Sequence, residues 1–106
     1  MQQAKKISAK TRSSYQKLED VIGCKWSVSV LTNVGKGINR PGELERAIEG
    51  ISTKVLSERF RKLVDYGLLD KKTFNELPPR TEYSLTVKGK KLVEIILQIQ
   101  QLDEQI

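Results

Sequence analysis

A strong helical periodicity lies near the middle of the chain. Its apolar positions fall at i, i+4 and i+7 and are Leu56, Phe60 and Leu63. Ser52 is a favoured N-cap ahead of this stripe, and Gly67 is a favoured stop behind it. The pattern therefore predicts an amphipathic helix over about residues 52–66.

The side of this helix opposite the stripe is polar. It carries Lys54, Ser57, Glu58, Arg61, Lys62 and Asp65. Lysine and arginine pair with phosphates, and arginine also reaches the edge of a guanine. A solvated face would explain an isolated charged helix equally well, so the neighbouring elements decide the interpretation.

Three helices are predicted ahead of this one, over about residues 15–22, 25–34 and 39–48. Trp26 lies on the apolar side of the second, which assigns it to the core. Pro41 suits the first turn of the third helix, and a turn of three or four residues then leads to Ser52. Two helices joined in this way indicate a helix-turn-helix, with residues 52–66 as its recognition helix.

Two short strands are predicted next, and together they form a wing over about residues 68–85. The loop between the strands contains two prolines and ends at Arg80. A stiff hairpin after a recognition helix places Arg80 to enter a minor groove, where arginine is attracted. The alternative is an ion pair of Arg80 with Glu76 or Glu82.

The last predicted helix begins after Thr86, and the segment 86–106 is expected to form a dimer interface. Lys88 lies in its first turn, where a cation opposes the helix dipole unless an anion such as a DNA phosphate offsets it. Its apolar residues are Leu92, Ile95, Ile96, Ile99, Leu102 and Ile106. This stripe exceeds what so small a core needs, so we expect it to pack on the first helix of a partner, through Tyr15 and Leu18. Packing within the same chain is the alternative.

Composition agrees with one domain and a polyanionic partner. The 106 residues suffice for one core, and the net charge is +6. Residues 1–12 are basic and aperiodic, which predicts a flexible arm ahead of a single domain at 13–106. We expect no cofactor and no metal site, because histidine is absent and there is one cysteine. The same absence argues against an enzyme, and no apolar run is long enough for a membrane span, so we expect a cytoplasmic protein.

Several stretches together resemble the HxlR-type regulators, a branch of the MarR-like winged-helix proteins. They are Asp20–Trp26, Arg40–Leu44, Gly50–Leu63, Gly67–Leu68, Pro78–Thr86 and Gly89. They occur in unbroken order over about residues 15–92, and the whole series at these spacings is specific. The resemblance implies an α+β fold, mainly α: a winged helix-turn-helix whose terminal helices form a dimer interface.

The resemblance also implies a homodimer that binds an inverted-repeat operator in double-stranded DNA. Its recognition helices are expected in successive major grooves and its wings at the minor grooves. By position, the DNA-contacting residues are Ser52, Thr53, Lys54, Ser57, Arg61, Arg80 and Lys88. Arg59 also matches a family arginine, but it lies beside the apolar stripe. We therefore expect it to hold the motif together, with a phosphate contact as the alternative.

The sequence departs from the family pattern at three positions. Many members have a sensing cysteine thirteen positions ahead of the tryptophan, where this chain has Ser13, and Thr53 replaces a usual proline. The one cysteine, Cys24, replaces a usual glycine. It is a candidate redox or effector site if a helix N-terminus and Lys25 lower its pKa, and a structural thiol otherwise.

A second function class fits the same composition. A winged-helix module can serve in protein interactions or as a non-specific architectural element on nucleic acid, without an operator of its own. The ratio of the affinities for a selected site and for random duplex separates the two classes.

Overall fold

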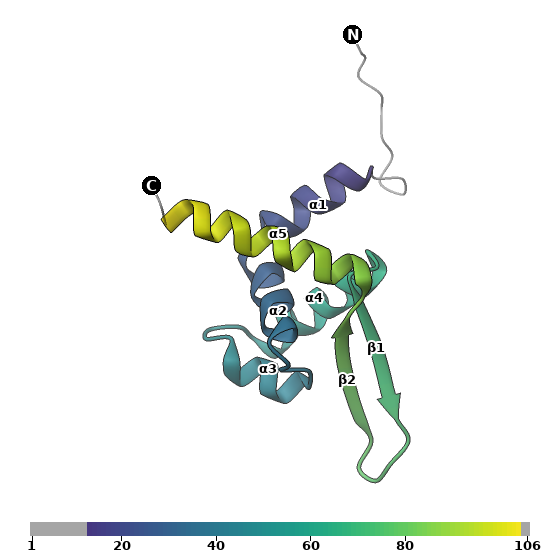
Figure 1. The fold of residues 1–106 in the computed structure, drawn as a ribbon. Coiled ribbons are helices and arrows are strands. Elements are labelled where there is room, and N and C mark those ends of the chain that lie inside the picture. The colour runs from purple at the N-terminus through teal and green to yellow at the C-terminus, as the bar shows by residue number, and fades with distance from the viewer. Residues whose placement is uncertain (1–12, 105–106) are drawn as a thin grey trace.

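The computed structural model describes residues 13–104. Five helices pack together, and a two-stranded hairpin projects from them (Figure 1). The elements are α1 (Ser14–Ile22), α2 (Lys25–Gly35), α3 (Pro41–Ala47), α4 (Thr53–Asp65), β1 (Leu69–Phe74), β2 (Arg80–Leu85) and α5 (Val87–Glu104). The predicted fold class is confirmed: the described chain is mainly helical, with an antiparallel hairpin directly after a helix-turn-helix. The predicted basic arm and Ile106 lie outside the described residues.

Side-chain caps fix where the helices begin. Ser52 Oγ accepts a hydrogen bond from the backbone N–H of Val55 at 3.1 Å, which starts α4 as predicted. Thr86 Oγ1 accepts from the N–H of Gly89 at 2.9 Å and thereby starts α5. After α4, Gly67 has a φ of +76°, a left-handed conformation that glycine adopts without strain.

The core is built around α2, which packs against α1, α3, α4, α5 and β2. Val30 and Leu31 of α2 are fully buried, and Leu56, Phe60 and Leu63 of α4 are buried as the periodicity predicts. Trp26 is only half-buried at the edge of this core, with Lys25 Nζ 4.6 Å from the centre of its ring. Helix α4 is therefore fixed along one side by apolar contacts.

The wing is fastened to the helix-turn-helix at its base. In the register of the hairpin, Leu69 pairs with Leu85 and Phe74 with Arg80. Tyr83 of β2 stacks on Phe60 of α4 with ring centroids 3.9 Å apart and planes 11° apart. The N–H of Tyr83 also donates to the carbonyl of Asn39, ahead of α3, at 2.8 Å. The position of the wing relative to α4 is thus set by a stacked ring pair and a backbone hydrogen bond.

Helix α5 has a buried side and an exposed side. Leu92, Val93 and Ile96 are buried in the core of the chain, whereas the remaining large apolar residues of the helix after Val93 are exposed: Ile95, Leu97, Ile99 and Leu102. For Leu92 and Ile96, therefore, the structure shows packing within one chain, which was the alternative to a dimer contact. Ile95, Ile99 and Leu102 remain available to a partner.

Tyr15 is 73% exposed on α1, while Leu18 packs against the core. The C-terminal half of α5 and the start of α1 project from the molecule far from the tip of the wing (Figure 1). None of the helices within residues 13–104 has the length and apolar character required to cross a membrane.

Candidate nucleic-acid interface

The outward face of α4 presents three exposed polar side chains in a row. Lys54, Ser57 and Arg61 are spaced by three and four residues, so they lie on one side of the helix. None of them makes a hydrogen bond or ion pair with another residue in the described part of the chain. The structure thus brings together three of the predicted contact residues with their donors free.

Ser52 and Thr53 stand at the start of the same helix, and both hydroxyls already have internal partners. Ser52 caps the helix, and Thr53 Oγ1 donates to Glu45 Oε2 of α3 at 2.7 Å. The hydrogen bond from Thr53 joins the two helices of the motif. A phosphate contact by Thr53 would compete with this bond, whereas the Ser52 hydroxyl proton is not used by the cap.

Arg80 is the first residue of β2, directly after the loop that joins the two strands, and it is held by two carboxylates. Its Nη1 lies 3.3 Å from Glu76 Oε2 and its Nε 3.1 Å from Glu82 Oε2. The guanidinium carbon lies 4.0 Å from the centre of the Phe74 ring. The structure therefore shows the ion pairs that were the alternative to a minor-groove contact, and it shows both at once.

Lys88 lies in the first turn of α5 and reaches the end of α4. Its Nζ donates to the carbonyl of Tyr66, the C-cap of α4, at 3.4 Å. A cation is favourable at the C-terminal end of a helix dipole, so α4 offsets part of what Lys88 costs at the start of α5. The partly negative neighbour that the structure shows for this side chain is therefore the carbonyl of Tyr66.

Sequence reasoning missed Lys71, which lies beside the recognition helix. A hollow of about 370 Å³ between α4 and the hairpin is lined by Ser57, Phe60, Arg61, Val64, Asp65, Lys71 and Tyr83. Lys71 pairs with Tyr83 in the hairpin register, and paired residues share one face of a sheet. The position of Lys71 could have been predicted from Tyr83: Tyr83 is buried against α4, and the residue paired with it lies on the same face of the hairpin.

Leu77 is a second feature that the sequence reading passed over. It is 96% exposed between the two strands, next to Pro78 and Pro79. The sequence does indicate this exposure, because Leu77 is a large apolar residue in a proline-rich loop where no other part of the hairpin can bury it. The tip of the wing is therefore apolar rather than cationic.

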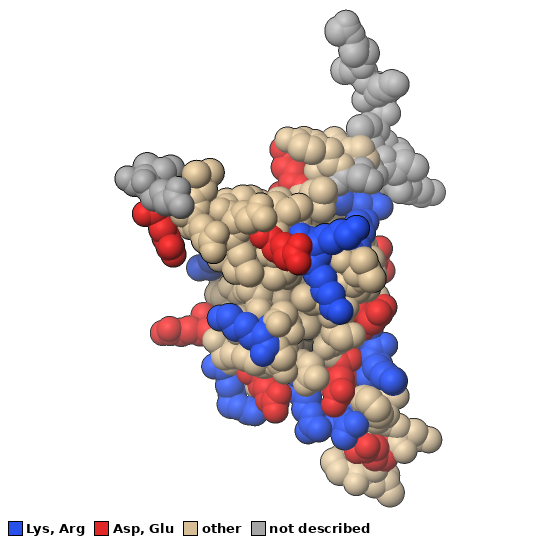
Figure 2. Space-filling view, viewed as in Figure 1, with Lys and Arg blue, Asp and Glu red and all other residues tan. Residues whose placement is uncertain are grey.

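Charge is unevenly spread over the face drawn in Figure 2. Lysine and arginine gather mostly below α5, over α3 and the upper part of the wing, with acidic residues among them. Surface around the C-terminal end of α5 shows uncharged and acidic residues instead. A polyanion is attracted to the first region and repelled by the second.

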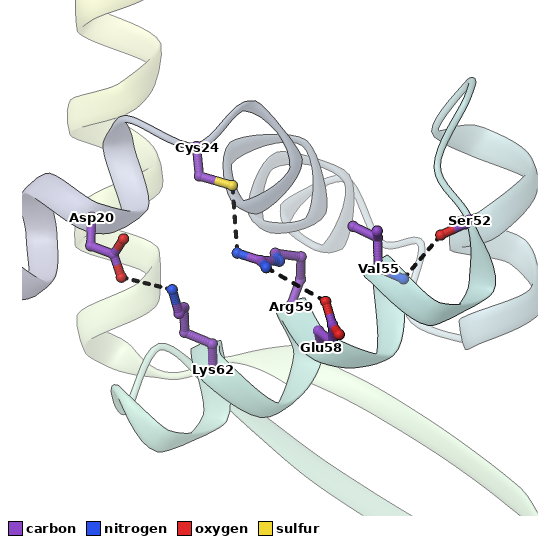
Figure 3. A network of polar contacts seen from close by, with 7 residues as sticks. All are labelled: Asp20, Cys24, Ser52, Val55, Glu58, Arg59 and Lys62. Atoms are coloured by element: carbon purple, nitrogen blue, oxygen red, sulfur yellow. Dashed lines mark hydrogen bonds and ion pairs between the residues drawn. The ribbon is translucent and has the colours of Figure 1, made fainter.

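The inner side of α4 carries cations that are paired with groups of α1 and the corner between α1 and α2 (Figure 3). Lys62 Nζ lies 2.8 Å from Asp20 Oδ2, which also accepts from the Tyr66 hydroxyl at 2.9 Å. The assignment of Lys62 to the outward polar face was therefore wrong, because its long side chain turns back to α1. Arg59 Nη1 donates to Cys24 Sγ at 3.7 Å, and Nη2 lies 3.8 Å from Glu58. This agrees with the expectation that Arg59 holds the motif together.

Cys24 occupies the N-cap position of α2 and is half-buried. Burial raises the pKa of its thiol, but hydrogen bonds from the Ser27 hydroxyl and from the N–H groups of Ser27 and Trp26 lower it, as does the Arg59 guanidinium. The lowering effects together are larger, so the pKa lies below its ordinary value. Within residues 13–104 no cluster of three or more acidic or cysteine side chains is placed to bind a metal ion.

Comparison with known proteins identifies the family of this chain. The family model described as HxlR-like helix-turn-helix matches residues 21–106. The HTH-type transcriptional regulator sll1512 of Synechocystis, itself uncharacterized, is 38% identical over 87 residues, which cover 82% of this chain. The chain spans 64% of the length of that relative. YkvN of Bacillus subtilis, another uncharacterized HTH-type transcriptional regulator, is 36% identical over 85 residues, covering 80% of this chain and 72% of YkvN.

Solved structures agree with the family model. A chain from Enterococcus faecalis V583, described as a transcriptional regulator of the MarR family, has 35% identity and a TM-score of 0.78, covering 92% of this chain and 91% of its own. The redox regulator HypR in its oxidized form has 30% identity and a TM-score of 0.77, covering 89% of this chain and 97% of its own. The match of residues 21–106 includes the helix-turn-helix, the wing and α5. The chain belongs to the HxlR-like helix-turn-helix transcriptional regulators, within the MarR-like winged-helix proteins.

Proposed function

We propose that this protein is a sequence-specific, double-stranded-DNA-binding transcriptional regulator that acts in the cytoplasm as a homodimer. Helix α4 enters a major groove and the wing approaches the adjacent minor groove. The observation that carries the proposal is the row of Lys54, Ser57 and Arg61 on the second helix of the motif. These donors are exposed and unpaired within the described residues, while the opposite side of α4 is fixed by the core.

The three side chains have different roles, some in affinity and some in specificity. Arg61 can form a bidentate pair with a guanine, Ser57 can donate to a base or a phosphate, and Lys54 can neutralise a phosphate. Lys71 and Arg61 face the same hollow between α4 and β1. A DNA strand that passes from the major groove at α4 to the minor groove at the wing would cross this hollow, with a cation on either side.

A second copy of the chain is the proposed partner on the surface formed by Tyr15, Ile95, Ile99 and Leu102. These residues are large, apolar and between 46% and 73% exposed. A two-fold axis through this surface relates two α4 helices, and a two-fold protein reads an inverted repeat. The half-sites are then expected about one helical turn, ~34–36 Å, apart.

The proposal is tested by selection from a randomised duplex pool at near-physiological salt, followed by sequencing of the retained DNA. Enrichment of an inverted repeat would establish the operator. Retention of DNA without enrichment would favour the non-specific architectural module instead.

Substitutions on α4 test the assignment of the contact residues. We expect Lys54→Ala to weaken binding to all duplexes and to reduce the log–log salt slope by about 1. Arg61→Ala is expected to cost about 1–3 kcal/mol and to relax specificity at one base pair. Lys36→Ala, which removes an exposed cation at the end of α2, is the matched control. Parent-like binding by both α4 variants would show that another face contacts the DNA.

A further inference from the structure

The tip of the wing carries a large apolar side chain that nothing in the described part of the chain covers. Leu77 is 96% exposed, and the rest of the loop 75–79 is exposed with it. The end of the hairpin projects away from the helices (Figure 1), and its surface is mostly uncharged, with acidic atoms among it (Figure 2). Leu77 therefore adds little to the packing of the fold and is available to a partner.

The loop that presents Leu77 is stiff. The two residues after it are both prolines, whose rings hold φ at about −65°. On its other side, the N–H of Glu76 donates to the carbonyl of Phe74 at 3.0 Å. Arg80 closes the loop, with Nη1 3.3 Å from Glu76 Oε2 and the guanidinium carbon 4.0 Å from the centre of the Phe74 ring. A side chain held in this way loses less conformational entropy on binding than one on a flexible loop.

The hairpin also has the length to carry this side chain to a neighbouring groove. Tyr83 of β2 stacks on α4 and pairs with Lys71 of β1. The pair of Phe74 and Arg80 lies three residues further along each strand, or about 10 Å at the usual rise per residue. The loop takes Leu77 beyond that point. Half a turn of B-DNA, which separates a major groove from the adjacent minor groove, is about 17 Å. With α4 in the major groove, as proposed, Leu77 lies within reach of the minor groove.

The shape of the tip suits a DNA groove better than a protein surface. A stable protein interface buries about 800 Å² on each partner, and one leucine on a narrow loop offers far less. The minor groove is about 6 Å wide, which fits a single side chain. Charge does not draw the tip to DNA, because residues 73–79 contain no lysine or arginine and Arg80 pairs with Glu76 and Glu82. A contact between the tip and DNA therefore depends on apolar surface.

We propose that Leu77 is an intercalating wedge, which enters the minor groove next to the bases read by α4, separates two neighbouring base pairs and bends the DNA. The inference deepens the proposed function and rests on it. Leucine is among the apolar residues that proteins insert between base steps, and such insertion bends DNA by about 20–90° toward the major groove. Pyrimidine–purine steps unstack most easily. Leu77 thus selects DNA by its deformability, in addition to the bases that α4 reads.

The first experiment measures the bend by energy transfer between dyes at the two ends of the selected operator. The parent protein is expected to bring the ends together. Leu77→Ala, which removes no internal contact and should fold, is expected to reduce the bend and to lower affinity by about tenfold, or about 1.4 kcal/mol. Leu77→Met keeps a large apolar side chain and should keep the bend. Val87→Ala, at a 72% exposed apolar position outside the wing, is the matched control and should bend the operator as the parent does.

Salt dependence separates a wedge from an electrostatic contact. Leu77→Ala removes no charge, so the log–log salt slope of its binding should equal that of the parent. Lys54→Ala, in contrast, should reduce the slope by about 1. A reduced slope in Leu77→Ala would show that the tip acts through phosphate contacts, and it would overturn the wedge.

A fluorescent base locates the step that is opened. 2-Aminopurine replaces each adenine of the operator in turn, and its fluorescence rises where stacking is lost. The parent is expected to raise the signal at one fixed position in each half-site, at or beside a pyrimidine–purine step. Leu77→Ala should not raise it there.

Failure of the wedge and failure of the proposed function give different results. A parent that binds the selected operator without bending it would overturn the wedge, and so would a parent-like bend in Leu77→Ala, which would favour a protein partner for the tip. If selection retained DNA without enriching a site, the same bend measurement on random duplex would decide. A parent that bound no duplex at all would overturn the proposed function, and the wedge with it.

Discussion

Among single residues, Gly89 makes the closest approach between two parts of the chain. A Cβ at this position would clash with the backbone carbonyl oxygen of Leu68, and backbone atoms cannot move aside as a flexible side chain can. The same carbonyl accepts a hydrogen bond from the N–H of Thr86 at 3.2 Å, so the start of α5 lies directly on the segment after α4. We expect Gly89→Ala to lower the free energy of unfolding by about 2–3 kcal/mol, as overpacking does. Urea denaturation of the two proteins measures this.

Gly42 provides the matched control for that substitution. It lies exposed in α3, and an added Cβ would meet only the end of the Arg46 side chain at 3.6 Å. Gly42→Ala should therefore raise stability by up to about 1 kcal/mol through helix propensity. If Gly89→Ala unfolded like the parent, the close contact between α5 and Leu68 would be refuted.

Tyr83 links pH to the stability of the recognition helix and the wing. Burial raises the pKa of its phenol, so above the ordinary tyrosine pKa of about 10 the unfolded chain releases a proton that the folded chain retains. The stability that Tyr83 contributes is therefore fully present below that pH and is lost as pH rises further, through the raised pKa of the folded protein. Tyr83→Phe keeps the ring stacked on Phe60 and should remove this part of the pH dependence. Urea denaturation from about pH 8 to about pH 11 measures how the free energy of unfolding changes with pH, with Tyr15→Phe as the control. If the free energy of unfolding of Tyr83→Phe fell with pH as steeply as that of the parent, the assignment would be contradicted.

The sequence predicts which residues share the outward face of α4 only where helix periodicity alone determines it. Lys54, Ser57 and Arg61 were correctly placed on one face, because their spacing fixes that face whatever surrounds the helix. Lys62 was not, since its long side chain turns toward Asp20, a partner from α1 that no local pattern identifies. Long, flexible side chains choose partners from the tertiary structure, and a sequence does not display those neighbours.

At the scale of elements, the wing holds Arg80 in two ion pairs, with which the proposed DNA contact of this residue would compete. Arg80 is paired with both Glu76 and Glu82. We expect Glu76→Gln to raise DNA affinity by roughly two- to fivefold, because it removes a negative charge and leaves Arg80 with one ion-pair partner, Glu82, instead of two. Titration of the selected operator measures the gain.

A double-mutant cycle separates those two causes. In an Arg80→Ala background the loosening of Arg80 can no longer contribute, and only the general charge effect remains. The gain from Glu76→Gln should shrink accordingly. An equal gain in both backgrounds would mean that Arg80 remains a brace of the wing and does not reach the DNA.

Element boundaries could be predicted well where a cap or a stop encodes them. Ser52, Gly67 and Thr86 each end or begin an element as expected, since each acts through its own backbone and the next few residues. The burial of Leu92 and Ile96 was harder to foresee. A stripe of apolar residues on a helix predicts a buried face, but it does not say whether that face is buried by the same chain or by another.

For the whole molecule, the proposed dimer rests on the distribution of exposed apolar surface. Ile99 and Leu102 are 46% and 60% exposed on α5, and Ile99 also borders an apolar hollow of about 150 Å³ with Ile22 and Val28. The row proposed to contact DNA lies on α4, a separate element that packs on α2, α3 and β1. Dimerisation and DNA contact can therefore be separated by mutation.

We expect Leu102→Lys and Ile99→Lys to convert the proposed dimer into a folded monomer. A two-fold interface repeats each substitution on both copies, so two lysines would be brought together at a surface that must lose its water. Val87→Lys, at a 72% exposed position at the other end of α5, is the matched control and should remain dimeric. Sedimentation equilibrium gives the mass of each variant. In operator titrations the monomers should lose affinity for the inverted repeat far more than for one half-site, because the second half-site is no longer bound by a linked partner. Variants that stay dimeric would place the interface elsewhere on the chain, and a monomeric parent would remove the dimer from the proposed function.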